Sequence, residues 1–278
     1  MTTDVQEQST ALGQPVELYR FSYDLTRLCY SDTDVTVGHD GDNYYPGEAL
    51  SRDPINASGS LDKAAIEVSI AESSDVAKLW AGYPPSDVVG LTVFRCHLRE
   101  DGTNTIPMAI WVGRVIACSY ERYIAKLSCE PAATSMQRVG LRRHYQYMCP
   151  HALYGTACGA NRASHTVGRT AVAWDMRSVT VSGHLGDQYR GGIVSWQPAA
   201  YPMEQRTILG VHRLESGETR LDVAGRPHHL RPGDLVSVAR GCLHTLDECS
   251  GVFDNAPNFG GMPYIPTNNP HGTTRIFN

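Results

Sequence analysis

Apolar and polar residues alternate along much of the first half of the chain, which is the pattern of β-strands that bury one face. The alternating runs are residues 35–37, 44–45, 65–70, 91–98, 107–112, 114–118 and 123–129. The Asp40-Gly41 pair between the first two runs favours a hairpin turn, because both residues tolerate positive φ angles. Gly113 separates two of the later runs, and we expect a bulge or bend there. The pattern predicts a β-rich domain.

One short helix competes with the strands in this half. We expect it at residues 74–80, where Ser74 or Asp75 can cap the first turn. Gly82 and the Pro84-Pro85 pair follow and would end it. The fold class expected for this half is therefore mainly β, with few short helices.

The alternation stops near residues 132–147, and we place a domain boundary there, giving domains 1–136 and 137–278. Strand patterns return at residues 179–181, 192–196, 208–214, 219–223 and 232–238. They predict a β-barrel-like insert at about 165–240. The last thirty residues are rich in Pro, Gly and Asn, so an extended tail is expected. The sequence as a whole predicts two β domains, the second containing the insert.

Composition excludes several classes of function. The 278 residues suffice for two domains. The net charge of −5 and the lack of a long basic stretch argue against sequence-specific nucleic-acid binding. No apolar run approaches the roughly 20 residues of a membrane span. The first ten residues are polar and acidic, unlike a secretion signal, so we expect folding in a reducing cytosol with free thiols.

Four of the eight cysteines form two close pairs on either side of the predicted insert. Cys149 and Cys158 have eight residues between them, and Cys242 and Cys249 have six. Clustered cysteines in a reducing compartment more often bind metal than form disulfides. Zinc ribbons and fingers usually place two to four residues between paired ligands, so the wider spacing favours a larger inorganic core. The other cysteines stand singly in apolar or alternating segments and are expected to be buried and inert: Cys29, Cys96, Cys118 and Cys129.

Several polar residues flank the paired cysteines. His151 and His244 each follow a leading cysteine by two positions, and we expect them to hydrogen-bond or pack beside the site, because four cysteines already complete a ligand set. Asp247 and Glu248 are expected at the surface, since carboxylates compete poorly with thiolates for a soft metal. Three arginines before the first pair either lie beside the site or form a solvated basic turn: Arg138, Arg142 and Arg143.

The sequence lacks the common catalytic motifs. It has no Gly-x-Ser-x-Gly, phosphate-binding loop, dinucleotide fingerprint or His-Glu-x-x-His. A thiol or iron-sulfur enzyme, such as a cell-wall hydrolase with Cys149 as nucleophile, stays open as an alternative. The favoured expectation is that the protein is not an enzyme.

Several motifs in the second half resemble the carboxy-terminal signature of tailed-phage tail-tip and baseplate hub proteins, of the lambda tail-tip protein L and gene transfer agent hub type. The motifs are residues 149–159, residues 241–249, Phe253-x-Asn255, residues 258–266 and Asn269-Pro270. Leu243 stands where a polar residue is usual in this family, which affects hydrogen bonding around the site. The first half is similar to the β-rich region that accompanies this signature only at the level of pattern.

The resemblance implies a structural virion protein of the tail tip or baseplate, assembled in the host cytoplasm. It implies a 4Fe-4S cluster bound by Cys149, Cys158, Cys242 and Cys249, with a four-cysteine zinc site as the alternative. The implied assembly is a homotrimer that joins the tail tube or distal tail ring to the central fibre or tail-tip protein. The Pro- and Gly-rich tail would then dock on a neighbouring subunit or pack on its own domain.

Overall fold

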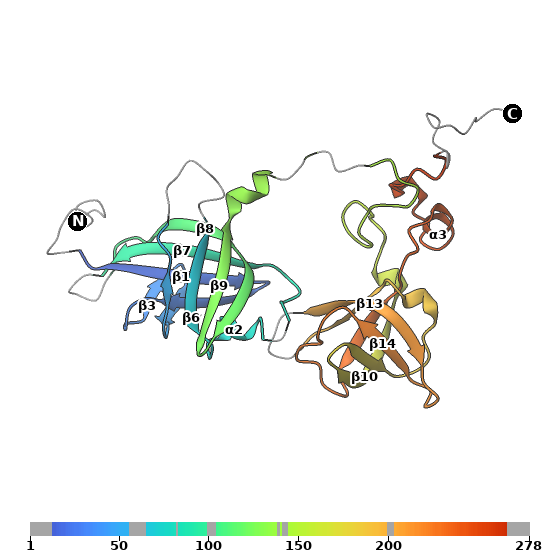
Figure 1. The fold of residues 1–278 in the computed structure, drawn as a ribbon, viewed down its shortest axis with the longest axis horizontal. Coiled ribbons are helices and arrows are strands. Elements are labelled where there is room, and N and C mark those ends of the chain that lie inside the picture. Colours follow the sequence, from blue (N-terminus) through green and yellow to red (C-terminus); the bar gives the residue numbers. More distant parts are fainter. Residues whose placement is uncertain are drawn as a thin grey trace. The chain divides into compact units, whose positions relative to one another are not determined.

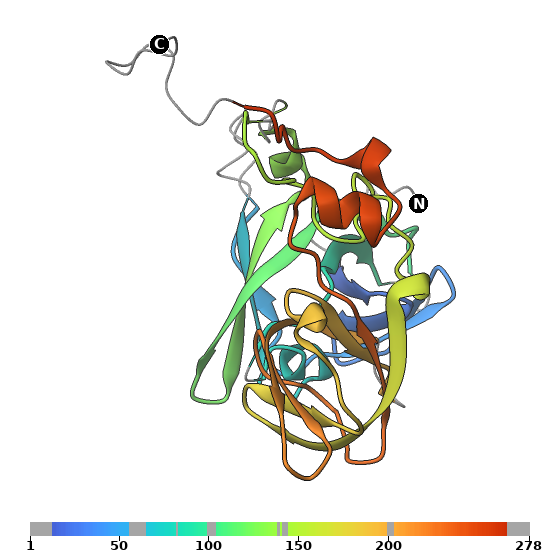
Figure 2. The same ribbon diagram turned by 90° about the vertical axis from the view of Figure 1, so that its right-hand side faces the viewer.

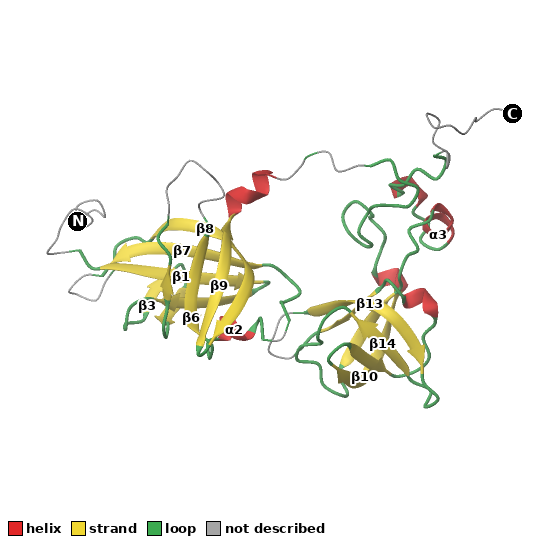
Figure 3. Ribbon diagram, viewed as in Figure 1, coloured by secondary structure: helices red, strands yellow, loops and turns green. Residues whose placement is uncertain are grey.

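The computed structural model describes residues 13–55, 65–81, 83–98, 104–137, 140, 144–198 and 203–265. The chain divides into two compact units, Met1–Arg138 and Val139–Asn278 (Figure 1). Strands dominate each unit, as Figure 3 shows, and the α-helices of the described residues are short: α2 (Asp75–Lys78) and α3 (Leu246–Gly251). The mainly β fold class is confirmed. No helix within these ranges is both long and apolar enough to cross a membrane.

The first unit is built around one nine-stranded sheet with the order β3-β4-β2-β1-β7-β8-β9-β6-β5. All neighbouring strands are antiparallel except β2 and β4, which run parallel. The strands are β1 (Pro15–Tyr23), β2 (Thr26–Ser31), β3 (Val37–His39), β4 (Asp42–Pro46), β5 (Ser51–Arg52), β6 (Ile66–Ala71), β7 (Val89–His97), β8 (Met108–Glu121) and β9 (Ile124–Pro131).

The two ends of this sheet are joined by one stretch of chain. β4 pairs with β2 near one end, whereas β5, only a few residues later, pairs with β6 at the other end. Residues 42–52 therefore bridge both ends, and the sheet curls around its apolar core. The largest core cluster includes Tyr19, Phe21, Leu91 and Leu127, all at most 1% exposed.

A buried carboxylate ties three strands of the first unit together. Glu17 on β1, 8% exposed, accepts hydrogen bonds from Arg52 Nε (2.7 Å) on β5, Arg95 Nη2 (2.9 Å) on β7 and the Tyr19 hydroxyl (2.9 Å). Burial by itself would raise the pKa of Glu17, but the hydrogen bonds from Arg52, Arg95 and Tyr19 outweigh it and hold the pKa below its ordinary value. The carboxylate thus stays charged and fixes the curled sheet.

Two local expectations for the first unit have different outcomes. The cap of the short helix is confirmed, because the Ser74 hydroxyl accepts the Ala77 N–H at 3.3 Å. The bulge expected at Gly113 is wrong, since β8 runs unbroken through that residue and its register shifts between Val115 and Ala117 instead. Gly113 serves another purpose: a Cβ there would collide with the Glu130 carbonyl on β9.

The second unit contains a closed six-stranded barrel with the order β10-β11-β14-β13-β12-β15. The barrel lies between the two cysteine pairs, which confirms the predicted β-barrel-like insert. Trp196, Ile208 and Leu221 are among the side chains that fill its interior. Its strands are β10 (Thr166–Asp175), β11 (Ser178–Val181), β12 (Ile193–Trp196), β13 (Glu204–Arg213), β14 (Thr219–Val223) and β15 (Leu235–Ala239).

A buried ion pair closes one end of the barrel core. Arg206 Nη1 donates to Glu204 Oε2 at 2.7 Å, and both side chains are almost fully buried. The Arg206 guanidinium also lies 5.9 Å from the Trp196 ring centre, and the indole N–H donates to the His228 carbonyl at 2.8 Å. The Glu204 carboxylate, the Arg206 guanidinium and the Trp196 indole N–H therefore each have a specific partner in this buried setting.

Candidate metal centre

The two cysteine pairs lie at the base of the barrel, where the chain enters and leaves it. The first and last barrel strands pair with each other, with Thr166 opposite Ala239, and the Arg240 N–H donates to the His165 carbonyl at 2.9 Å. Figures 1 and 2 show the segments before β10 and after β15 side by side. The Tyr154 hydroxyl joins them by donating to the Arg240 carbonyl at 2.7 Å. Barrel folding therefore brings together two cysteine pairs that are far apart in sequence.

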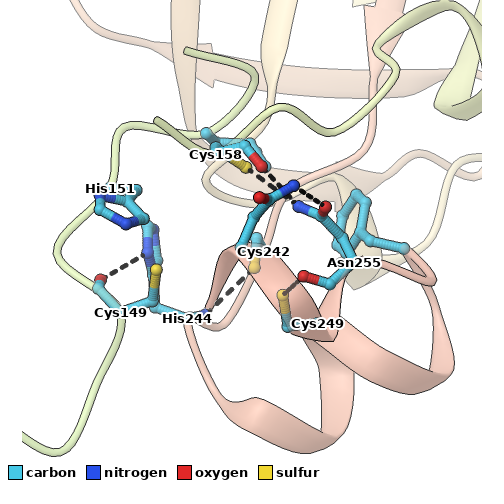
Figure 4. Close-up of a pocket in the computed structure, with 10 residues that line it drawn as sticks. Cys149, His151, Cys158, Cys242, His244, Cys249 and Asn255 are labelled. Atoms are coloured by element: carbon cyan, nitrogen blue, oxygen red, sulfur yellow. Dashed lines mark hydrogen bonds between the residues drawn. The ribbon is translucent and has the colours of Figure 1, made fainter. Parts of the chain in front are cut away.

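All four paired cysteines line one cavity of about 20 Å³. Figure 4 shows their sulfur atoms arranged around this space. Cys249, on α3, is 8% exposed, whereas Cys149, Cys158 and Cys242, in the loops, are partly exposed. The remaining walls are His151, Leu153, His244, Phe253, Asn255 and Asn258. The structure thus assembles the predicted cysteine set, while ligation itself stays a prediction.

N–H groups point at three of the four sulfur atoms. The His244 N–H donates to Cys242 Sγ at 3.3 Å, and the Gly260 N–H donates to Cys149 Sγ at 3.4 Å. The Asn255 side-chain amide lies 3.9 Å from Cys158 Sγ. Donors of this kind stabilise negative sulfur and tune the potential of bound clusters. These three donors, taken by themselves, favour the thiolate form of the cysteines.

Asn255 connects the second members of the two pairs. Its side-chain amide donates to the Cys158 carbonyl at 2.6 Å, and its own carbonyl accepts the Cys249 thiol at 3.3 Å (Figure 4). Asn258 orients it by donating to its Oδ1 at 2.7 Å. Asn255 is 8% exposed. In the sequence it stood out only as part of the family-like signature, because its partner Cys158 lies 97 residues away.

The two histidines support the site, as expected. His244 faces Cys149, whose N–H donates to the His244 carbonyl at 2.9 Å. His244 Nδ1 lies 3.0 Å from the Cys149 carbonyl, so this nitrogen carries the proton and donates it. The ring of His151 lines the cavity and lies against Gly260. The expectation that the histidines hydrogen-bond or pack beside the cysteines is confirmed.

The expectation of a surface role holds for Asp247 but is wrong for Glu248. Asp247 is exposed, whereas the Glu248 side chain is largely buried. The Glu248 carboxylate accepts the Leu243 N–H at 2.7 Å and lies 3.4 Å from Arg240 Nη2. It thereby ties the loop of Cys242 to the helix of Cys249. The Thr245-Leu-Asp-Glu248 sequence is a capping-box pattern, which could have revealed this role.

The electrostatics of the cavity favour a bound cation. Burial raises the pKa of the Cys242 and Cys249 thiols, and the neighbouring sulfurs raise it further. The Cys242 and Cys249 thiols therefore resist ionisation unless positive charge compensates them. Within the described ranges, no three His, Cys, Asp or Glu side chains converge closely enough to hold a single metal ion as they stand. The donor chemistry nevertheless fits a soft metal or an iron-sulfur cluster.

Of the remaining cysteines, Cys96 and Cys129 are buried as expected, whereas Cys29 and Cys118 are only partly buried. All eight are free thiols. Cys96 and Cys129 are buried within the first unit, and burial raises the pKa of Cys129 to about 12. Cys29 and Cys118 are partly buried against apolar clusters. Three arginines were expected near the first pair, Arg138, Arg142 and Arg143, and they lie outside the described residues. The Asn269-Pro270 motif lies outside them as well.

Two β domains, the second with a barrel between paired cysteines that line one cavity, define a mainly β protein with a four-cysteine site. The model of one family, described as baseplate hub protein, N-terminal attachment domain, matches residues 5–161, more than half of the chain. The protein belongs to this family of phage baseplate hub proteins. Membership makes it a structural component of the phage tail and agrees with the expectation that it is not an enzyme.

Two further comparisons give matches in the second unit and over the whole fold. A family model described as phage conserved hypothetical protein BR0599 matches residues 187–269. A chain from a structure titled virion of native gene transfer agent (GTA) particle is similar in fold, with a TM-score of 0.78 and 18% sequence identity. The likeness covers 95% of this chain and 92% of that chain. No curated protein matches the sequence.

Proposed function

We propose that this baseplate hub protein holds a 4Fe-4S cluster through Cys149, Cys158, Cys242 and Cys249, and that the cluster has a structural role. The observation behind the proposal is that four cysteines from two distant segments line one cavity at the base of the barrel. Hydrogen-bond donors directed at their sulfurs support it, since such donors accompany thiolate-bound clusters.

The arrangement of the sulfurs favours a cluster over a single zinc ion. Zinc would require all four sulfurs to move to about 2.3 Å from one centre. In a four-iron cluster each iron takes one thiolate, so the sulfurs stay spread around the cavity wall. The wide spacing within each cysteine pair suits the second arrangement. A four-cysteine zinc site in the same structural role is the alternative that the metal analysis below decides.

The bound cluster would supply a cross-link between the two ends of the barrel insert. Bridging Cys149 to Cys249 closes a loop of roughly one hundred residues, and the loop-closure model assigns large chain-entropy stabilisation to loops of that size. The protein supplies the rest: α3 positions Cys249, Glu248 ties down the loop of Cys242, and Asn255 fixes Cys158. The result would be a stiff connection in a part that carries load.

The proposed assembly is a homotrimer that joins the tail tube or distal tail ring to the central fibre or tail-tip protein. The family description as an attachment domain and the fold shared with a virion chain support this position. Mass measurement of the purified protein and cross-linking mass spectrometry of intact tails test it. A monomer that cross-links to neither neighbour in assembled tails would overturn it.

The metal assignment is tested on protein purified without oxygen, by measuring iron, acid-labile sulfide and zinc per chain. A cluster predicts four irons, four sulfides and a broad absorbance near roughly 400 nm. Cys158→Ala should lose the iron, whereas the matched control Cys129→Ala, which removes a buried thiol of the first unit, should retain it. Colourless protein with one zinc per chain would overturn the cluster.

A further inference from the structure

The chain after α3 passes over the candidate metal centre. We call residues 259–265 the strap. The strap runs along the segment that precedes the first cysteine pair, where the Met262 N–H donates to the Gln146 carbonyl at 2.8 Å. A turn follows, in which the Ile265 N–H donates to the Met262 carbonyl at 3.2 Å. Among the described residues, the strap is therefore held to the segment before Cys149 by few backbone hydrogen bonds.

Two glycines let the strap approach the site closely. A Cβ on Gly260 would collide with the His151 ring, and one on Gly261 would lie only 2.5 Å from the Tyr147 carbonyl oxygen. Without side chains at both positions, the Gly260 N–H reaches Cys149 Sγ at 3.4 Å. The close approach of the strap therefore brings one of its N–H groups to a sulfur atom of the site.

The beginning of the strap is linked to a second cysteine. Asn255 and Asn258 precede Phe259, the Asn258 amide holds Asn255, and the Asn255 amide holds the Cys158 carbonyl. The strap therefore depends on the positions of Cys149 and Cys158, one from each end of the first pair. A metal-bound sulfur carries more negative charge than a thiol and accepts a stronger hydrogen bond. Occupancy of the site should therefore strengthen the hydrogen bond from the Gly260 N–H to Cys149 Sγ.

We propose that metal or cluster binding locks the strap in place, so that residues 259–265 are held in the loaded protein and released in the stripped protein. This inference rests on the proposed function, because it requires a group bound by the four cysteines, although it holds for iron and zinc alike. Tyr264, 88% exposed at the end of the strap, is then presented in a fixed position only when the site is loaded.

Hydrogen-exchange mass spectrometry tests the inference on the full chain, before and after removal of the metal by a chelator. Amide exchange in residues 259–265 should accelerate by about tenfold or more on stripping, because a charge-assisted hydrogen bond is lost. Exchange in β14, inside the barrel, should accelerate less than exchange in the strap. Equal strap protection before and after metal loss would overturn the inference, as would equal loss of protection in β14.

A pair of glycine variants separates the strap from the ligands. Gly260→Ala keeps all four cysteines and should accelerate strap exchange in the metal-loaded fraction of the protein, because a Cβ there collides with the His151 ring and displaces the N–H from Cys149 Sγ. Gly251→Ala is the matched control, since a Cβ there meets nothing within 4 Å. Normal strap protection in Gly260→Ala would refute the inference alone. Wild-type protein purified without any bound metal would refute the proposed function and the inference together.

Discussion

Replacing Asn255 tests how far the metal centre depends on a residue that is not a ligand. Asn255→Ala removes the donor to the Cys158 carbonyl and the acceptor of the Asn258 amide, two partly buried hydrogen bonds made by a buried side chain. A buried polar group left without its partner costs about 1–3 kcal/mol. We take about 2 kcal/mol, which lowers the melting temperature of a domain of this size by roughly 8 °C.

The same change should weaken metal binding. Residues that orient metal ligands typically contribute 10- to 100-fold to affinity, and Asn255 is the side chain that joins Cys158 to the segment of Cys249. Asn255→Asp should be worse than Asn255→Ala, because it replaces an amide donor by a negative charge beside the sulfurs. The assay is iron per chain after anaerobic purification, combined with thermal unfolding of loaded and stripped protein.

The control for this experiment is Asn258→Ala, which deletes only the hydrogen bond to Asn255 Oδ1. It should lose less iron and less thermal stability than Asn255→Ala. Wild-type iron content and melting temperature in Asn255→Ala would refute the reasoning, because Asn255 would then be a bystander at the cavity wall.

Three further predictions concern the rest of the chain. The folded-state pKa of Glu17 is held below its ordinary value of 4.5, so the carboxylate stabilises the fold fully above pH 4.5, and this contribution disappears as the pH falls through the folded-state pKa. The free energy of unfolding, measured with urea from pH 3 to 7, should therefore fall less steeply with acid in Glu17→Gln than in the wild type. An equal slope in the two proteins would contradict this. Glu204→Ala leaves Arg206 buried without its carboxylate and should cost about 3 kcal/mol or more in urea unfolding, whereas the exposed control Glu215→Ala should cost under about 0.5 kcal/mol. Burial raises the pKa of Cys129 to about 12, so this thiol should not react with thiol reagents at pH 8. Metal removal should expose the four site cysteines to the same reagents. An unchanged number of reactive thiols after chelation would count against ligation.

The sequence predicted the elements that follow a simple period. Strands with one buried face alternate visibly, as β6 and β9 do, and five of the six barrel strands were anticipated for the same reason, whereas β10 was missed. β1 was missed because both of its faces are buried: Leu18 packs in one apolar cluster and Tyr19 in another, so the alternation disappears. Periodicity detects the contrast between two faces, and a strand buried on both sides has none.

The cysteines of the candidate site were found from sequence, but most of their supporting groups were not. Glu248 was placed at the surface because its charge was considered without its capping position. Asn255 and Gly260 act on sulfurs or carbonyls about one hundred residues away, so nothing near them in sequence indicates their partners. Backbone N–H donors leave no trace in residue type at all. The candidate ligands can be recognised from the residue type and spacing of the cysteines, whereas the groups that hydrogen-bond to them can be recognised only in the folded chain.

The pairing of β10 with β15 has an evolutionary consequence. Because the barrel begins and ends at adjacent points, with Thr166 opposite Ala239, its interior can change without moving the segments that carry the cysteines. Loops between β11 and β14 can lengthen, or the whole barrel can be exchanged, provided that the first and last strands still meet. The cysteine pairs thus flank an insert that can be exchanged as a unit. Related particles could vary this barrel while the segments that carry the cysteines stay the same.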